Sequence, residues 1–192
     1  MHGTGGEVTG MEQTAIREQD AVGTAGSVAQ FLTFALGHET YGLPVEYVKE
    51  VIEYCRVFPV PRVPEHIRGV INLRGEVLPV IDLPYLFYGA HAEITPASGI
   101  VFIEVRHEAE VVVVGAVIDA VDAVTGIPHN AIEPAPAFGE RIRPEYIRGV
   151  GRSGDRFIIL LDPARVFDID ALSRGQAEYS GAGSLKGEAR NG

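Results

Sequence analysis

The sequence predicts an all-β protein of two small barrels, each with about five strands, related by pseudo-symmetry and joined by short helices. Two observations lead to this prediction. Short runs rich in Val, Ile, Phe and Tyr alternate with turn residues, and one long segment of the chain is repeated later. A length of 192 residues suits one domain or two small ones.

The apolar runs place the strands in chain order. Pro79, inside one of these runs, predicts a sheet edge or a bulge. Two short helices are expected, one over Leu83 to Tyr88 and one from Pro163 to about Leu172, where proline suits the first turn. The expected strand runs are 31–36, 40–45, 47–54, 69–73, 76–83, 99–105, 110–121 and 156–162.

The internal repeat defines the architecture. PEHIRGVINLRGEVLPVIDLPYLF (64–87) aligns without a gap to PEYIRGVGRSGDRFIILLDPARVF (144–167), with eight of 24 positions identical. Upstream, residues 41–51 are more weakly similar to residues 114–124. Neither copy alone would bury enough apolar surface, so the two barrels are expected to share a central apolar layer.

The two ends of the chain differ in composition from the middle. Residues 1–29 contain no Leu, Phe, Tyr or Trp, and 11 of the 23 glycines lie in 1–29 and 174–192. We expect a flexible N-terminal arm over 1–29, a folded domain over 30–173 and a flexible C-terminal tail over 174–192. Neither a signal peptide nor a membrane helix is expected, which predicts a cytoplasmic protein.

Charge and cysteine content exclude several classes of function. The formal net charge is -10, and residues 30–173 carry 20 acidic and 12 basic side chains, so nucleic acid is not expected as a partner. Arg68, Arg74 and Arg148 stand out on this acidic body. The single cysteine, Cys55, excludes an internal disulfide and a cysteine-based zinc site, and we interpret it as a small packing residue rather than a nucleophile.

The motifs that suggest chemistry have simpler explanations. Gly149, Gly151 and Gly154 match the spacing of a dinucleotide-binding loop, but they lead into a strand, so a hairpin turn is the favoured interpretation. Asp119 and Asp122 would face opposite sides of an extended strand, which favours a turn or capping role for Asp119. The six histidines show no metal-ligand spacing, and no catalytic serine motif occurs. We therefore expect no enzyme activity, cofactor, metal or small-molecule substrate.

Four blocks together resemble the CheW family: QFLTFALGHETYGLPVEYVKEVIEY, IRGVINLRGEVLPVIDL, VVVVGAVIDAVDAV and EYIRGVGRSGDRFIILLD. The resemblance covers residues 30–173. It implies two interlocked five-stranded SH3-like barrels around a common hydrophobic core. It also implies an adaptor that couples the cytoplasmic signalling tips of chemoreceptors to the regulatory domain of the histidine kinase CheA, without direct membrane insertion. The long N-terminal arm and the insert over 91–99 depart from the family.

The resemblance also implies five receptor-binding positions. Glu50 and Arg74 match a family pair that lies close together at the receptor-facing surface, although an ordinary surface ion pair is the alternative. Val48, Gly69 and Gly115 match family positions near the groove where a receptor helix docks. Gly69 has an equally good structural explanation, because Gly149 occupies the same place in the repeat.

The kinase-binding surface is expected on the first barrel. Our candidates are Val51 and Ile52, with Tyr54 and Phe58 in the loop over 54–61, because exposed apolar residues on such a loop would mark a partner site.

Three functions of different classes remain open from the sequence. The first is the receptor–kinase adaptor of chemotaxis. The second is the same module in a non-flagellar pathway, such as type IV pilus motility or development. The third, and weakest, is a small hydrolase on a barrel fold.

Overall fold

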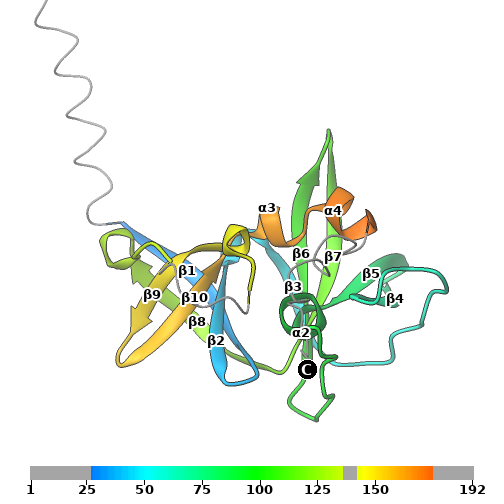
Figure 1. The fold of residues 1–192 in the computed structure, drawn as a ribbon, viewed down its shortest axis with the longest axis horizontal. Coiled ribbons are helices and arrows are strands. Elements are labelled where there is room, and N and C mark those ends of the chain that lie inside the picture. The colour runs from blue at the N-terminus through cyan, green and yellow to red at the C-terminus, as the bar shows by residue number, and fades with distance from the viewer. Residues whose placement is uncertain (1–26, 136–141, 175–192) are drawn as a thin grey trace, which may run out of the picture.

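The computed structural model describes residues 27–135 and 142–174, which form two five-stranded sheets that curl into barrels lying side by side (Figure 1). Barrel A has the strand order β8-β1-β2-β10-β9, and barrel B has the order β3-β6-β7-β5-β4. The strands are β1 (Val28–Leu36), β2 (Glu39–Pro44), β3 (Val48–Glu53), β4 (Ile67–Leu73), β5 (Glu76–Asp82), β6 (Gly99–His107), β7 (Glu110–Ile118), β8 (Ala120–Pro128), β9 (Ile147–Ser153) and β10 (Arg156–Leu161). The all-β prediction is confirmed.

The two barrels do not correspond to the two halves of the sequence. Barrel A takes β1 and β2 from the first half and β8 to β10 from the second, whereas barrel B takes β3 to β5 from the first half and β6 and β7 from the second. The prediction of two five-stranded barrels is confirmed, and they are interlocked as the family resemblance implied. The parallel pairs β2–β10 and β5–β7 join strands of different halves.

Equivalent residues of the repeat occupy equivalent places. Leu160 of β10 pairs with Gly42 of β2, and Val80 of β5 pairs with Gly115 of β7. A side chain at either glycine would press on its neighbours at about the same distance, with closest approaches of 3.0 Å in both barrels. The weaker sequence similarity between residues 41–51 and 114–124 therefore reflects a structural repeat.

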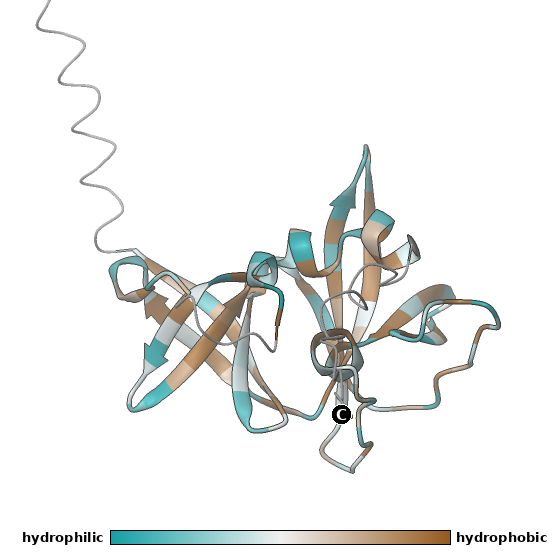
Figure 2. Ribbon diagram, viewed as in Figure 1, coloured by the Kyte–Doolittle hydropathy of each residue, from teal (hydrophilic) through white to brown (hydrophobic). Residues whose placement is uncertain are grey.

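A shared hydrophobic core lies between the barrels, and a smaller core fills each barrel. Figure 2 shows that apolar stretches follow the strands, while hairpin tips are hydrophilic. Barrel A encloses Phe31 and Ile127, and barrel B encloses Phe102 and Val117. The shared layer draws on both sheets and the helices, and its fully buried members include Phe34, Leu36, Tyr41, Leu43, Leu83, Val101, Ile103, Ala116, Ile118 and Leu161.

Three short helices cover the junction of the barrels: α2 (Leu83–Tyr88), α3 (Pro163–Val166) and α4 (Ile169–Arg174). The Tyr41 ring of β2 packs against the Phe87 ring of α2 with centroids 5.7 Å apart, which joins barrel A to barrel B. Burial is the main cause that raises the pKa of Tyr41, whose hydroxyl contacts the Tyr88 hydroxyl and the Glu39 carboxylate. These rings link the barrels through a buried contact.

Several element predictions need correction. The helix expected from Pro163 to Leu172 is two helices, because Asp168 interrupts it and caps the second with a bond from Ala171 N to Asp168 Oδ1 of 3.0 Å. Strand β8 follows β7 as a strand of its own, whereas the sequence predicts a single run over 110–121. Strand β1 begins at Val28, inside the expected arm, and the remainder of that arm and of the C-terminal tail lies outside the described residues. The helix over Leu83–Tyr88 is confirmed.

Pro79 lies in β5, between β4 and β7, rather than on an edge strand. Its neighbour across the hairpin is Val70, whose backbone N–H and C=O both bond to Phe58 instead. The pairing with β7 begins only at Val80. The missing N–H of proline therefore removes no ladder bond.

Among residues 27–135 and 142–174, no helix is long and apolar enough to cross a membrane.

Candidate partner-binding surface

A tight turn between β4 and β5 presents Arg74 to solvent. Arg74 and Gly75 both have positive φ, 51° and 94°, and Gly75 N donates to Asn72 Oδ1 at 2.9 Å. Two central residues with positive φ are typical of a type I′ hairpin turn, in which Asn or Gly is the usual first residue. Arginine is therefore an unfavourable choice for the turn itself.

The Arg74 guanidinium pairs with Glu50 on the edge strand β3. Arg74 Nη2 lies 2.9 Å from Glu50 Oε1, with the arginine side chain 79% exposed and the glutamate side chain 19% exposed. Next to this pair, Lys49 lies 3.9 Å from Glu76 and 3.6 Å from Glu104. The proximity of Glu50 and Arg74 that the resemblance implied is thus present.

Strand β3 carries residues of both predicted binding sets. Its register changes between Val48 and Glu50, so that Val48 and Val51 lie on the side of the shared core, while Glu50 and Ile52 lie on the side of the interior of barrel B. Val51 is exposed, whereas Val48 and Ile52 are half-buried. The receptor and kinase candidates are therefore interleaved on one strand of one barrel.

The loop after β3 presents an exposed aromatic side chain. Phe58 is 52% exposed, although its backbone is held to Val70 of β4 by two hydrogen bonds of 2.8 Å. The Arg56 guanidinium carbon lies 5.3 Å from the centre of the Phe58 ring. An exposed aromatic ring on a fixed backbone, flanked by arginine, has the composition of a protein-interface centre.

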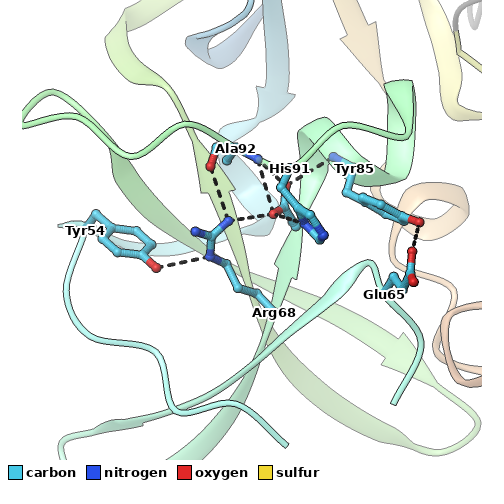
Figure 3. Close-up of polar contacts among 7 residues, drawn as sticks. Tyr54, Glu65, Arg68, Tyr85, His91 and Ala92 are labelled. Carbon is cyan, nitrogen blue, oxygen red and sulfur yellow. Dashed lines mark hydrogen bonds and ion pairs between the residues drawn. The ribbon is translucent and has the colours of Figure 1, made fainter. Parts of the chain in front are cut away.

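A buried carboxylate, Asp82, joins several segments beside this loop. Asp82 Oδ2 accepts from Arg68 Nη1 at 2.6 Å and from His91 Nδ1 at 3.0 Å. Asp82 Oδ1 accepts from the backbone N–H of Tyr85 at the start of α2 and from that of Ala92, both at 3.1 Å. Figure 3 shows these contacts converging between β4, α2 and the loop after it. We call this set the Asp82 cluster.

Arg68 extends the Asp82 cluster to the loop after β3. Its Nε donates to the Tyr54 hydroxyl at 3.1 Å, and its guanidinium carbon lies 5.6 Å from the centre of the Tyr54 ring (Figure 3). The Tyr54 backbone N–H donates to the Ser98 carbonyl at 2.9 Å. Arg68 was expected to stand out on the surface, but only 24% of its side chain is exposed because it folds onto Asp82.

The outer rim of the Asp82 cluster is aromatic. The His91 ring stacks on the Tyr85 ring with centroids 4.5 Å apart, and the Tyr85 hydroxyl donates to Glu65 (Figure 3). This hydrogen bond to Glu65 raises the pKa of Tyr85. The insert after α2 is therefore ordered against the barrel rather than projecting freely.

The buried ring of His66 joins α4 to barrel B. Its Nε2 carries the proton and donates to the Leu172 carbonyl at 2.9 Å, because a carbonyl oxygen only accepts. Burial lowers the pKa of His66 and Arg143 lowers it further, against the opposing effect of the hydrogen bond to Leu172. The neutral ring is thus the form that fits this site.

Two of the predicted receptor residues are buried glycines. A side chain at Gly69, where φ is 144°, would come within 2.1 Å of the Phe58 carbonyl oxygen. Gly115 lies in β7 between Ile100 and Phe102, each of which would be 3.0 Å from an added Cβ. Neither glycine is placed to contact a partner directly, so any role in receptor binding is exerted through the packing around it.

The glycine motif and the Asp119/Asp122 pair take the structural roles that the sequence predicts. Gly149 and Gly151 lie in β9 and Gly154 in the turn to β10, so the three glycines form a hairpin. Asp119 accepts from the Gly37 backbone N–H at 2.6 Å, whereas Asp122 pairs with an arginine of β10.

The interpretation of Cys55 as a packing residue is wrong. Cys55 is exposed, because it lies just after the end of β3 where the chain leaves the sheet. Within the part of the chain that the structure describes, no group of three or more His, Cys, Asp and Glu side chains could hold a metal ion.

Sequence reasoning missed the roles of Asp82 and His91. Asp82 stands out in the sequence only as one of the identical positions of the repeat, and a pattern of identity does not show which side chains meet. His91 lies in the insert, which has no counterpart in the second copy. The helix-capping position of Asp82, two residues before Pro84, was the one available signal.

Two interlocked barrels with an exposed ion pair and an exposed aromatic loop define a protein-binding module of the SH3-like barrel type. The CheW-like domain model matches residues 30–171 of this chain. The chain therefore belongs to the CheW family of chemotaxis coupling proteins.

Individual relatives agree with this assignment. The chain is 34% identical to the chemotaxis protein CheW of Klebsiella aerogenes over 144 residues, covering 75% of this chain and 84% of that protein. It is 35% identical to the protein FrzA of Myxococcus xanthus over 132 residues, covering 69% and 80%. Its structure resembles that of the scaffolding protein TtCheW from Thermoanaerobacter tengcongensis with a TM-score of 0.64 and 32% identity, covering 71% and 85%.

Proposed function

We propose that this chain is a non-enzymatic adaptor in the cytoplasm that couples chemoreceptor signalling tips to the regulatory domain of the histidine kinase CheA. The main observation behind the proposal is the Arg74–Glu50 ion pair, in which the exposed Arg74 of the β4–β5 turn lies 2.9 Å from Glu50 of β3. The turn accepts an arginine at positive φ, which disfavours this residue. A functional demand for the guanidinium explains that choice better than turn stability does.

The receptor-binding surface in this proposal centres on Glu50 and Arg74, with Val48 beside them on β3. Gly69 and Gly115 support it from within the barrel. The kinase-binding surface uses Val51, Ile52, Tyr54 and Phe58, of which Phe58 and Val51 are the exposed apolar members.

Simultaneous binding explains how such an adaptor acts. A rigid body that holds receptor and kinase raises the effective concentration of each for the other. Control of the kinase requires, in addition, that the contacts at one surface differ between two signalling states. The nearness of both surfaces along β3 favours such coupling.

The experiment is a binding measurement with a receptor signalling-tip fragment. Arg74→Ala should weaken receptor binding while the melting temperature stays within a few degrees, because an exposed ion pair contributes only ~0–1 kcal/mol to stability. Arg74→Asn is the sharper variant, since asparagine suits the turn and removes only the charged group. Undiminished receptor binding by both variants would remove Arg74 from the site.

The similarity to the chemotaxis protein CheW of Klebsiella aerogenes favours chemotaxis over another pathway. Affinities for candidate receptors and kinases of the same organism would test this assignment directly. Tight binding to a pilus-pathway kinase alone would contradict it.

A further inference from the structure

The sequence repeat supplies an internal comparison for the Arg68–Asp82 pair. Arg148 and Asp162 occupy the same positions in the second copy. Asp162 accepts from the Ala164 N–H at 3.0 Å and so caps α3, as Asp82 caps α2. Among the described residues, however, exposed Arg148 makes no ion pair.

Both copies nevertheless build the same hairpin. Each has an irregular register beside its equivalent glycine, Gly69 or Gly149, and each aspartate N–H donates to a backbone carbonyl at 2.8 Å, that of His66 or Tyr146. Because the second copy folds this way without an arginine–aspartate pair, the hairpin does not require that pair. The Arg68–Asp82 contact must serve something that only the first copy has.

The bridge at Phe58 recurs in the second copy, where Glu133 lies opposite Val150. Among the described residues, two contacts do not recur: the insert places the Ala92 N–H on Asp82, and the Tyr54 hydroxyl accepts from Arg68. The second of these links Arg68 to the Tyr54–Phe58 segment. Arg68 holds the Tyr54 hydroxyl at one end, and the Val70 backbone holds Phe58 at the other. Between them lie exposed Cys55 and Arg56, with Arg56 stacked over the Phe58 ring. The segment is fixed at both ends, and Cys55 and Arg56 face solvent while Val57 packs against the core of barrel B.

We propose that Arg68 is a positioning residue for kinase binding: it orders Tyr54 and, through it, the segment that presents Phe58. This inference rests on the proposed function, because it explains how the kinase-binding surface is held in a conformation that can bind the kinase. Asp82 supplies the charge that keeps the guanidinium in place, and the Ala92 carbonyl lies 3.5 Å from Arg68 Nη1. A segment ordered before binding loses less conformational freedom when the partner docks.

The test compares Arg68→Lys, Tyr54→Phe and the double variant in the full chain, titrated with the regulatory domain of the CheA kinase. Lysine keeps a positive charge for Asp82 but has one nitrogen in place of the separate Nε and Nη1 atoms that bond to Tyr54 and Asp82, so it does not reproduce this bidentate geometry. Each single variant should raise the Kd for the kinase domain about tenfold, the order expected when side chains must be ordered on binding. The double variant should be no weaker than either single one, because both remove the same contact.

Two further measurements separate positioning from a general loss of structure. Binding of the receptor-tip fragment should be unchanged in all three variants. Arg148→Lys, the equivalent change in the second copy, should leave kinase binding unchanged.

The inference is overturned if Arg68→Lys binds the kinase domain like the wild type, if the two single effects multiply, or if receptor binding weakens equally. A wild-type chain that binds no kinase domain would instead overturn the proposed function. Wild-type binding that is unaffected by Arg68→Lys defeats this inference alone.

Discussion

Alanine at Gly69 and Gly149 should destabilise the two copies of the repeat unequally. A Cβ on Gly69 would lie 2.1 Å from the Phe58 carbonyl oxygen at a φ of 144°, whereas a Cβ on Gly149 would lie 2.7 Å from the Glu133 carbonyl oxygen. In both places the threatened contact is an isolated bridge of two backbone hydrogen bonds. Only Gly69 adds strain from positive φ.

The size of the effect follows from these contacts. Two lost hydrogen bonds cost roughly 2 kcal/mol in either copy, and a side chain at positive φ adds about 1–2 kcal/mol at Gly69. At about 2–4 °C per kcal/mol for a chain of this length, Gly69→Ala should lower the melting temperature by roughly 10 °C. Gly149→Ala should lower it by roughly 5 °C by the same conversion.

Thermal unfolding followed by circular dichroism measures the difference, and kinase-domain titration of the folded variants measures its consequence. Because the Gly69 bridge holds Phe58, Gly69→Ala should also weaken kinase binding, whereas Gly149→Ala should not. A Gly69→Ala protein that melts within about 2 °C of the wild type would refute this reasoning about the close approach. Equal or greater destabilisation by Gly149→Ala would refute it as well.

Three other predictions follow from the described contacts. The free energy of unfolding should fall as the pH drops below about 6.5, because the pKa of His66 is lowered in the folded state and the unfolded chain then binds more protons. His66→Gln keeps a donor for the Leu172 carbonyl and should make the free energy of unfolding less dependent on pH in this range. An unchanged pH dependence in this variant would show that His66 is not its source. Asp82→Asn should lower the melting temperature, since it weakens a buried pair with Arg68 and disturbs three other hydrogen bonds; calorimetry showing no loss would be inconsistent with this. Cys55 should react with a maleimide in the native protein at nearly the rate of a free thiol, because it is exposed, and slow labelling that speeds up in denaturant would show otherwise.

Much of the fold could be predicted from apolar runs, because most strands bury one or both faces. Strand β8 was not predicted as a separate strand because it lacks such a buried face over much of its length. Residues 121–124 are all exposed, so the segment shows neither alternation nor a buried run. Its place in the sheet is fixed by pairing with β1 rather than by its own burial.

The exchange of strands between the barrels could not be predicted from the repeat alone. Two similar copies can pair within themselves or with each other, and both choices bury the same kinds of side chain. The parallel pairing of β2 with β10 and of β5 with β7 decides between them, and it joins residues that are far apart in sequence.

In the candidate site, too, some contacts could be predicted from the sequence and others could not. The pairing of Glu50 with Arg74 came from family resemblance, since a separation of 24 residues gives no local signal. The Asp82 cluster was missed because it depends on a carboxylate whose four donors come from β4, α2 and the insert. Burial of a charge becomes visible only when its partners are placed around it.

The interlocked barrels bear on how the two surfaces are coupled. All nine candidate binding residues belong to barrel B or its loops, so no signal between them has to cross the shared core. Glu50 and Val51 are adjacent on β3 and face opposite sides of it. A shift of β3 caused by a receptor contact at Glu50 would therefore move Val51 and the start of the Tyr54 segment at once. Coupling over one strand requires only that strand to have two positions, and within residues 27–135 and 142–174 β3 is an edge strand that pairs only with β6.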